Sequence, residues 1–374
     1  MGRIVAWAMD SESGLYGFIS PDGAWVIRPS FDVCPGNFHD ELAVIKRQRI
    51  SNGVMLGCDC GFIDISGEIV IPISFPFLEG RSYFSNGLAI VGTEGSILAG
   101  YIDRNGKWQI EPRFYQPLPF KGKYTSAGNE RSVYGVIDKN GNWHVEPRYA
   151  WLDNFYEGLA CCNEHFSDEN WDPKSGYVNE DGELVIELGS GDWSEFDSFS
   201  EGRAKLTNWR SNLSIYIDKS GFPVGRTAVL AGGYFYEGLA QALDPNTNGA
   251  GFLGLDGNWA TSPVFYQVQD FYDGLAAAVA SGNPASSRQM IGGQMYVATV
   301  AGANGPLWGF INKRGEWAIQ PSYAGIRHFG AGYAAVRDAD TGKWGVIDKG
   351  GRWVTRPRFE GIGHFHDTEG PDRD

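Results

Sequence analysis

The chain has 374 residues, which is more than one conventional domain of roughly 100–200 residues needs. Its 14% aromatic residues, 52 glycines and only 20% charged residues exclude a disordered chain and disfavour long helices. A formal net charge of −14 would repel phosphate backbones and anionic lipids, so neither nucleic acid nor a membrane is expected as a partner.

The first residues and the cysteines indicate the compartment. The segment from Gly2 to Ala8 lacks the apolar core of a secretory signal, and no apolar run approaches the roughly 20 residues that cross a bilayer. The cysteines form an odd set without CxxC spacing, which favours reduced thiols over a disulfide framework or a zinc site. They are Cys34, Cys58, Cys60, Cys161 and Cys162. The sequence therefore predicts a cytoplasmic protein.

One repeated word fills the chain from about residue 4 to residue 365. A short apolar run leads into Asp-x-x-Gly, a tryptophan follows the glycine by two residues, and a proline follows the tryptophan by four. A closing word, Phe-x-x-Gly-Leu-Ala, precedes the next copy. About nine copies start near residues 17, 61, 100, 135, 176, 215, 251, 309 and 345. A period of this length predicts a tandem array of identical structural units.

Each part of the word has a physical interpretation. The apolar runs, rich in aromatic and β-branched residues, predict strands, and the Asp-x-x-Gly predicts a tight turn in which the Asp side chain caps the backbone. The proline ends the second strand, and the closing word makes a third. Each copy is therefore predicted as three short antiparallel strands in an all-β array. The repeated indoles are predicted to be the main contacts between neighbouring copies. They are Trp25, Trp108, Trp143, Trp259, Trp317 and Trp353.

The opening dipeptides carry a resemblance to a known family. Tyr16-Gly17, Tyr134-Gly135, Trp308-Gly309 and Trp344-Gly345, each followed by the turn and closing words, resemble the WG-repeat (KWG-repeat) proteins, which occur chiefly in bacteria. The resemblance covers nearly the whole chain and implies a β-rich interaction scaffold rather than a reaction. The sixth copy departs from it, with Ile215 in place of the glycine and no tryptophan.

The two ends of the chain are complementary in this pattern. The last copy stops before its third strand, and residues 2–8 align with a third strand. Residues 1–374 are expected to form a single array, and two architectures stay open. One is a propeller-like closed ring in which residues 2–8 complete the last copy, and the other is an open superhelical β-array.

Three insertions share one place in the repeat, between the third strand of one copy and the first strand of the next. Insertions of a repeat array map to loops on one face, often the binding face. The candidate binding residues are Lys46, Arg47 and Arg49 in the first insertion, Phe166 and Trp171 in the second, and Arg288, Met290, Met295 and Tyr296 in the third. The third insertion is expected to be either a partner-contacting hairpin or a disordered excursion. Tryptophans outside the repeat pattern, at positions 151, 171, 193 and 209, are further candidates for recognition.

No catalytic motif stands out, so the sequence predicts neither an enzyme nor a cofactor or metal site. The histidines are scattered, and the recurring Asp-x-x-Gly carboxylates belong to turns. The expected function is a non-catalytic protein–protein interaction scaffold that uses the loops between repeats. In its most specific form it is an immunity-type protein that neutralises a basic toxin or effector, steered by the net negative charge. The alternative is a receptor for a small ligand or glycan, or an unrecognised hydrolase, that uses a cavity or the non-repeated tryptophans.

Overall fold

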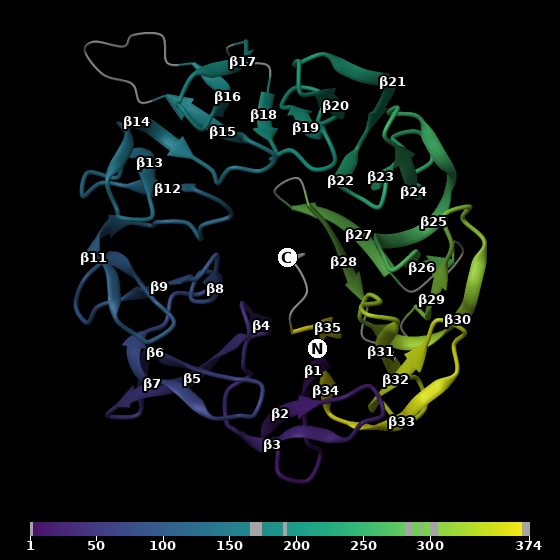
Figure 1. Cartoon of the computed structure of the whole chain (residues 1–374). Helices are drawn as coiled ribbons and strands as arrows, with labels where there is room; N and C mark the ends of the chain where they lie inside the picture. The colour runs from purple at the N-terminus through teal and green to yellow at the C-terminus, as the bar shows by residue number, and fades with distance from the viewer. Residues whose placement is uncertain are drawn as a thin grey trace. The chain divides into compact units, whose positions relative to one another are not determined.

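The structure is a computed structural model that describes residues 3–164, 174–189, 193–280, 286–291, 294–299 and 306–368. These residues form strands and turns without any helix, so no segment among them could cross a membrane as a helix (Figure 1). Every strand pair is antiparallel, and the predicted all-β class is confirmed. Phe166 and Trp171 lie outside the described residues.

The chain divides into two compact units built from repeats of the same kind. Unit 1 comprises Met1–Ser20, Ala24–Leu188 and His366–Asp374, and unit 2 comprises Pro21–Gly23 and Gly189–Phe365. The strands of unit 1 are β1 (Ile4–Met9), β2 (Tyr16–Ile19), β3 (Trp25–Phe31), β4 (Phe38–His39), β5 (Leu42–Ser51), β6 (Val54–Ile63), β7 (Ile69–Pro76), β8 (Phe84–Ser85), β9 (Leu88–Gly92), β10 (Leu98–Ile102), β11 (Trp108–Tyr115), β12 (Tyr124–Gly128), β13 (Tyr134–Asp138), β14 (Trp143–Leu152), β15 (Leu159–Glu164), β16 (Ser175–Asn179), β17 (Leu184–Leu188) and β35 (His366–Asp367).

The strands of unit 2 continue this series. They are β18 (Trp193–Phe196), β19 (Arg203–Asn208), β20 (Ser214–Asp218), β21 (Pro223–Val229), β22 (Ala231–Tyr236), β23 (Leu239–Leu243), β24 (Ala250–Gly254), β25 (Trp259–Tyr272), β26 (Leu275–Ala280), β27 (Ser286–Ile291), β28 (Gln294–Thr299), β29 (Trp308–Ile311), β30 (Trp317–Ile326), β31 (Tyr333–Asp338), β32 (Trp344–Asp348), β33 (Trp353–Phe359) and β34 (Gly361–Ile362).

The structural module is an antiparallel sheet in chain order, as in β4-β5-β6-β7. The three predicted strands are present, and a short first strand precedes them. The sequence predicts one strand for the closing word, whereas the structure folds this word into two, because a tight turn with positive φ at Asp40 (48°) and Glu41 (67°) reverses the chain between β4 and β5. Some strands serve two modules, since β25 pairs with both β24 and β26.

The glycine of the opening dipeptide is required by close backbone packing. An ideal Cβ on Gly135 would lie 2.5 Å from the Val145 carbonyl oxygen and 3.0 Å from the Trp143 ring. The same clash recurs in unit 2, where a Cβ on Gly309 would lie 2.5 Å from the Ile319 oxygen. The glycine and the tryptophan of one repeat therefore depend on each other. Because the glycine has no side chain, it leaves room for the indole and for the bulged fourth strand of the module.

The sixth copy shows how a side chain can replace that glycine. Along β20 and β21, the pairs Ser214↔Val229 and Tyr216↔Val224 are separated by five residues on β21. In β13 and β14, the corresponding pairs end at Val145 and Tyr149, which are four residues apart. The extra residue widens the bulge opposite Ile215, so a Cβ is accommodated there.

The repeated indoles pack against the preceding module. Phe114 and Trp143 meet edge to face at 5.2 Å and 82°, and Tyr323 and Trp353 meet at 5.8 Å and 86°. The predicted contact between copies is thus confirmed for these indoles, and the indoles share it with fully buried rings. The largest fully buried side chains are tyrosines and phenylalanines, whereas Trp353 is 37% exposed.

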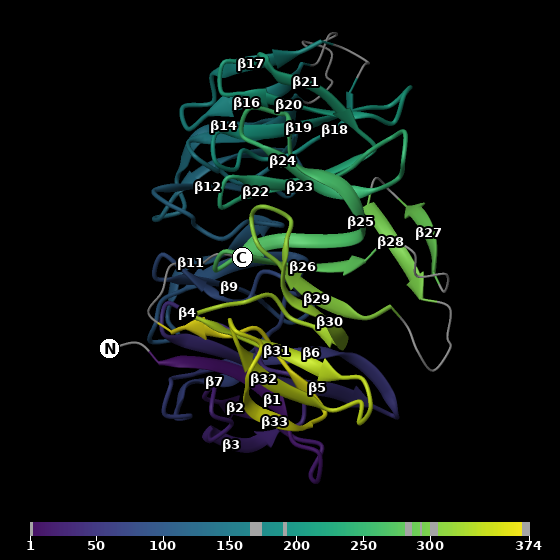
Figure 2. The ribbon, with the colours of Figure 1, turned by 90° about the vertical axis from the view of Figure 1, so that its right-hand side faces the viewer.

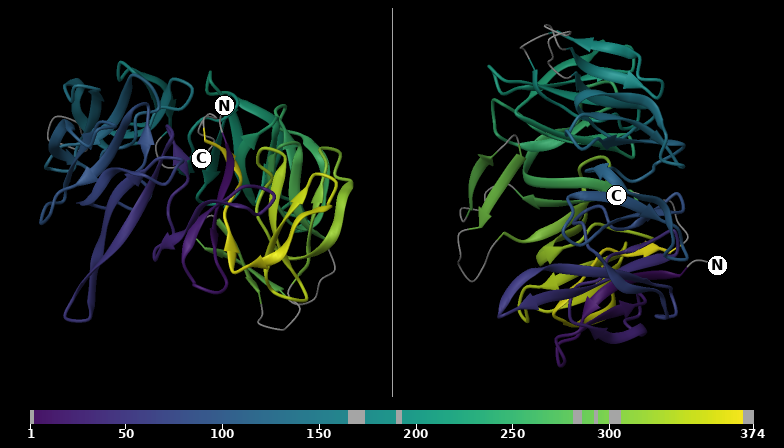
Figure 3. Two further views of the ribbon diagram at one scale, coloured as in Figure 1. Left: turned by 60° about the horizontal axis from the view of Figure 1, so that its bottom comes forward. Right: turned by 90° about the vertical axis from the view of Figure 1, so that its left-hand side faces the viewer.

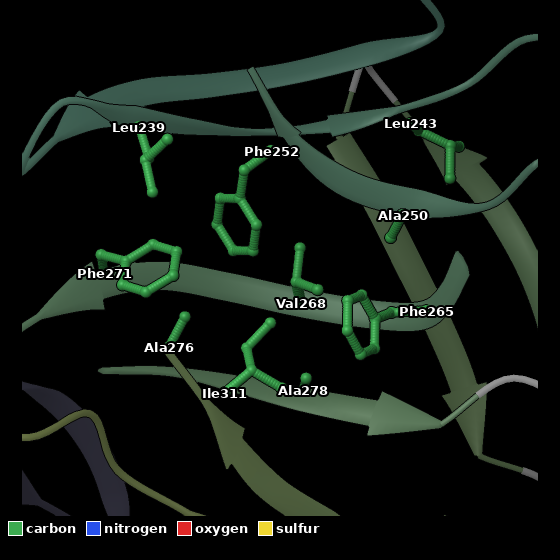
Figure 4. Close-up of a cluster of buried hydrophobic side chains, with 10 residues drawn as sticks. All are labelled: Leu239, Leu243, Ala250, Phe252, Phe265, Val268, Phe271, Ala276, Ala278 and Ile311. Carbon is green, nitrogen blue, oxygen red and sulfur yellow. The ribbon is translucent and has the colours of Figure 1, made fainter. Parts of the chain in front are cut away.

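A representative core cluster lies between neighbouring modules of unit 2 (Figure 4). Phe252 of β24 packs on Phe271 of β25 with ring centroids 4.6 Å apart, and both side chains are fully buried. Ile311 of β29 closes the cluster from the next module. Neighbouring modules of unit 2 thus share this buried cluster, which is why a repeat of this kind is not expected to fold alone.

Consecutive antiparallel connections alternate between the two ends of a module. One end, here called the glycine-turn end, carries the tight turn of the closing word and the Asp-x-x-Gly turn. Carboxylates in the tight turn of the closing word accept the backbone N–H of the glycine in the same turn of the next module. These pairs are Asp40–Gly87 at 2.7 Å, Glu201–Gly238 at 2.7 Å, Glu237–Gly274 at 2.9 Å and Asp273–Gly332 at 2.6 Å. The glycine-turn end is therefore held together by hydrogen bonds from module to module.

Cationic side chains reinforce the glycine-turn end. Lys139 donates to the Asn86 carbonyl at 2.9 Å. The Arg148 guanidinium donates to the Gly182 carbonyl of the next turn and lies 5.2 Å over the Tyr149 ring. The Pro-Arg-aromatic word that supplies this arginine recurs at Arg113 and Arg358, which reach the Gly141 and Gly23 carbonyls.

Replacing Arg148 with Met is expected to destabilise unit 1 by about 1 kcal/mol, because it removes a charged donor from a carbonyl while keeping most of the apolar stem. Urea unfolding followed by circular dichroism measures the change. Arg131→Met, at an exposed turn position, is the control and should change stability by less than about 0.5 kcal/mol. Equal losses in the two variants would contradict the role of the arginine.

The two ends of the chain meet within unit 1. β1 pairs with β35 through Ile4↔Asp367 and Val5↔His366. The N–H of Arg3 donates to the Thr368 hydroxyl at 3.0 Å, and the N–H of Thr368 donates to the Arg3 carbonyl at 3.1 Å. The pairing thus gives β1 a neighbour on this edge at Ile4 and Val5.

Candidate functional site: the loop end of the modules

The recurring acidic residues at the glycine-turn end serve the backbone. The Asp103 carboxylate accepts the N–H groups of Asn105 and Lys107, each at 2.9 Å. The hydrogen bond from the Lys107 N–H is the largest cause that lowers the pKa of Asp103. Asp348 is held in the same way, chiefly by the N–H of Arg352. These carboxylates cap turns, as predicted, and are not placed as paired catalytic acids.

Cys60, Cys161 and Cys162 are buried in the modules, and Cys34 and Cys58 are half-buried. Burial raises the pKa of Cys60 and of Cys162 to about 12, so both thiols are protonated at neutral pH. Among the described residues, no three His, Cys, Asp or Glu side chains come together in a way that could hold a metal ion.

The opposite end of each module, here called the loop end, carries the connections between the second and third strands. The three sequence insertions occupy this place: β5 to β6, β15 to β16, and β26 to β29. Of the second insertion, residues 165–173 lie outside the described chain. The loop end is therefore where modules differ, while the glycine-turn end repeats.

In unit 1 the first insertion is a long β-hairpin. β5 and β6 contain ten residues each, and they close through a tight turn with positive φ at Asn52 (51°) and Gly53 (76°). β7 pairs with β6 only as far as Asp59↔Pro76, so the last part of the hairpin extends beyond the sheet (Figure 3, left, dark blue). The large side chains of this projecting part, at positions 50 and 54–56, are exposed.

The predicted cationic residues lie along β5. Arg49 has its Nε 3.3 Å from an Asp59 carboxylate oxygen and its Nη1 3.9 Å from a Glu94 oxygen. The Lys46 ammonium lies 5.0 Å above the Phe77 ring, while Arg47 is exposed. The structure thus brings Lys46, Arg47 and Arg49 together on one strand.

The end of this hairpin is apolar, which the repeat pattern does not predict. Four large side chains around the turn are exposed: Ile50 by 62%, Val54 by 60%, Met55 by 57% and Leu56 by 62%. The available signal was an aliphatic run directly after Asn-Gly, which the repeat pattern assigns to an ordinary strand of the next copy. We call residues 50–56 the hairpin tip.

In unit 2 the third insertion contains a hairpin of its own, and its contact with a partner stays a prediction. β27 and β28 pair from Ser286↔Thr299 to Ile291↔Gln294 as a separate two-stranded sheet (Figure 2). The four predicted residues are on its backbone: Arg288 pairs with Val297, Met290 with Met295, and Gln289 with Tyr296. β26 and β29 pair directly with each other, so the module is complete without this hairpin.

Of the tryptophans outside the repeat pattern, Trp209 lies at the loop end. It follows β19 in unit 2, is 57% exposed, and carries the Arg210 guanidinium 5.1 Å over its ring. Trp151 is 40% exposed and lies on β14 opposite Asn163, and Trp193 lies on β18 opposite Asn208, the residue that precedes Trp209. Trp209 is therefore the most exposed of the three described members of this group.

The fold and its recurring devices define a tandem β-repeat protein. A family description, "WG containing repeat", matches residues 16–48, 61–95, 100–125, 134–161, 251–283, 308–340 and 344–370. Because these matches cover more than half of the chain, it belongs to the WG-repeat family. The copies predicted near residues 176 and 215 lie outside the matches, although β16–β17 and β20–β21 form the same type of hairpin.

Comparisons with solved structures give matches of low sequence identity. No curated protein matches the chain. A crystal structure of a eukaryotic initiation factor is similar with a TM-score of 0.46 and 10% identity, covering 87% of this chain and 97% of that one. Apo AztD from Citrobacter koseri has a TM-score of 0.38 and 12% identity, with 98% and 97% covered. Kluyveromyces lactis Hsv2 has a TM-score of 0.36 and 7% identity, with 75% and 94% covered.

Proposed function

We propose that this chain is a non-catalytic scaffold that binds a protein partner through the loop end of its modules. The observation that carries this proposal is the β27–β28 hairpin. It adds no strand to the module, since β26 and β29 pair with each other from Ala276↔Ile311 to Val279↔Trp308. A hairpin that the module does not need for its own pairing supports a role in recognition.

The contrast between the two ends supports the same conclusion. At the glycine-turn end, carboxylates and cations are used in hydrogen bonds between modules, as for Asp273 and Gly332. The loop end instead carries side chains that the fold does not use in this way, such as the exposed hairpin tip. The recurring acids cap turns and the buried thiols are protonated, which supports binding over catalysis.

Charge supports a basic partner. The net charge of −14 gives the whole chain a field that would steer a cationic protein on encounter and would weaken as salt rises. An immunity-type protein that neutralises a basic effector is the most specific form of this proposal. Association that is indifferent to salt would remove this form while leaving a protein partner in place.

The test is a variant in which a short Asn-Gly turn replaces residues 281–305. We expect its melting temperature to stay within about 2 °C of the parent, because the β26–β29 pairing is retained. A photo-reactive residue at position 296 of the full chain identifies the partner, and binding of the purified partner is then measured by titration calorimetry. The deletion should abolish binding, whereas Ile69→Ser, at an exposed position of the glycine-turn end, should not change it. Full affinity of the deletion variant would contradict the proposal.

A glycan receptor is the second candidate, and the exposure of Trp209 favours it. An exposed indole offers a flat apolar face beside a polar edge. Titration of intrinsic tryptophan fluorescence with a glycan panel, in the parent and in Trp209→Phe, discriminates the two functions. A response that disappears in the variant would favour the receptor, and silence throughout would remove it.

A further inference from the structure

The hairpin tip carries exposed apolar side chains on both faces of its ribbon. Ile50 pairs with Met55, and the next pair toward the turn is Ser51↔Val54. Adjacent pairs of an antiparallel ribbon point to opposite faces, so the apolar side chains of Met55 and Val54 leave the ribbon in opposite directions. Leu56 lies at the register shift between the pairs Ile50↔Met55 and Arg49↔Gly57. A ribbon that docks on a flat protein surface needs only one apolar face, whereas this tip suits an apolar medium that surrounds it.

Cationic side chains follow directly behind the apolar tip. Arg49, Arg47 and Lys46 lie one, three and four residues behind Ile50 on β5, which places their Cα atoms roughly 3–13 Å from it along the strand. Side chains that penetrate a bilayer interface reach about 5–10 Å into the boundary between headgroups and acyl chains. Lysine and arginine stems can extend along this depth while the charges stay at the headgroups.

The acidic side chains beside the cations, Asp59 and Glu94, lie 3.3 and 3.9 Å from the Arg49 guanidinium, which compensates part of their charge. The net charge of the rest of the chain does not reach the tip at full strength. The carbonyl of Cys58 on β6 accepts the N–H of Phe77, which is where β6 leaves the sheet. About five residues separate Cys58 from the turn at Gly53. This length corresponds to roughly 15 Å, or about twice the Debye length of about 8 Å at physiological salt. The repulsion from anionic lipids that the net charge of −14 predicts is therefore screened at the tip.

A second copy of the chain is a less suitable occupant. The outer edge of β5 would have to pair with the same strand of the second copy, because β4 covers β5 only at Leu42 and Ala43. Such antiparallel pairing about a two-fold axis would bring the Lys46, Arg47 and Arg49 cluster of one copy close to the same cluster of the other. Like charges on an edge strand oppose pairing of this kind.

We propose that the hairpin tip inserts into the interface of an anionic lipid bilayer, with Lys46, Arg47 and Arg49 at the level of the headgroups. This activity goes beyond the proposed protein scaffold and does not depend on it. It would attach the chain to a membrane surface reversibly, as expected for a few inserted apolar side chains and a small number of cations.

The experiment is co-sedimentation of the full chain with vesicles of phosphatidylcholine alone and with vesicles that contain about 30% phosphatidylserine. We expect sedimentation with the anionic vesicles that weakens when salt rises from roughly 0.05 to 0.5 M. Ile50→Ser and Leu56→Ser should each weaken partitioning roughly tenfold. Ile69→Ser is the matched control, since Ile69 is 60% exposed, and it should sediment like the parent. Circular dichroism confirms that all variants fold.

Three results would overturn the proposal. One is the absence of sedimentation with either type of vesicle, and another is unchanged sedimentation of Ile50→Ser. The third is a purified protein partner whose binding requires the tip while vesicles do not bind, which would assign the tip to a protein pocket. Equal sedimentation with both lipid compositions would overturn the contact of Lys46, Arg47 and Arg49 with anionic headgroups. The deletion of residues 281–305 leaves the tip intact, so the failures of the two proposals are distinguishable.

Discussion

Replacing Gly135 with Ala is expected to destabilise unit 1 by about 1–3 kcal/mol, or a fall of roughly 3–10 °C in the midpoint of its thermal transition. The added Cβ would lie 2.5 Å from the Val145 carbonyl oxygen and 3.0 Å from the Trp143 ring. The first of these atoms belongs to the backbone of β14, so the strand itself must move. Val136 and Val145 are paired directly beside the bulge, which ties this movement to the ladder.

Gly122→Ala is the control for this prediction. Gly122 has no atom within 4 Å of an ideal Cβ and is exposed, so the substitution should change stability by less than about 0.5 kcal/mol. Differential scanning calorimetry separates the transition of unit 1 from that of unit 2 where the two do not coincide. If Gly135→Ala and Gly122→Ala had the same midpoint, close packing would not be the reason for the glycine.

The turns and the strand order could be predicted because they depend on local chemistry. Asp138 caps its own turn through the N–H groups of Asn140 and Asn142, and this requires only residues within four positions. The repeated spacing then extends each local prediction along the chain. The short β4 escaped prediction, because a two-residue strand has no periodicity of its own.

Contacts between modules were harder to predict than the modules themselves. The repeated tryptophans are predicted to be contacts between copies, but Trp143, Trp317 and Trp353 also lie over the glycine of their own repeat, and Trp143 meets Phe114 of the preceding module edge to face. The Pro-Arg-aromatic word was visible at Arg113, Arg148 and Arg358. Its role depends on the position of the next turn, which only the structure shows.

Only part of the surface formed by the β5–β6 hairpin could be predicted, because the exposure of its residues depends on a neighbouring strand. Lys46, Arg47 and Arg49 were found because they interrupt the repeat, whereas Met55 and Leu56 resemble the apolar start of the next copy. Their exposure depends on where β7 stops pairing with β6, at Asp59↔Pro76. A sequence pattern predicts that a strand is present, but the length of its partner decides how much of it is covered.

Asp270 in unit 2 has a buried carboxyl group that is expected to lower the stability of the fold when it is charged. Its Oδ1 is buried and has no hydrogen-bond partner among the described residues. An ideal Cβ on Gly233 would lie 3.3 Å from this oxygen, so the carboxyl group packs against the backbone of β22. Burial raises the pKa of Asp270 to about 6, and a hydrogen bond from the Gln241 side chain opposes that rise only in part.

The stability of unit 2 is expected to fall as pH rises, because the pKa of Asp270 is raised in the folded chain. The pKa of Asp270 in the folded chain is about 6, above the usual 3.8, so the folded state binds the proton more tightly than the unfolded state does. The resulting stabilisation is complete below about pH 4 and is lost as pH rises through 6. A difference of about two pKa units corresponds to about 3 kcal/mol. The charged groups nearby are Asp197 and Lys205, whose carboxylate and ammonium are 2.9 Å apart and compensate each other.

Replacing Asp270 with Asn, which has nearly the same shape and no charge, should therefore stabilise unit 2 by about 1–3 kcal/mol at pH 7.5 and leave it nearly unchanged at pH 4. Urea unfolding at the two pH values measures this difference. Asp340→Asn, at an exposed position, should have little effect at either pH. A gain of the same size at both pH values would show that the benefit comes from the amide hydrogen bonds, and a loss at pH 7.5 would show that the Asp270 carboxylate is held by a favourable interaction.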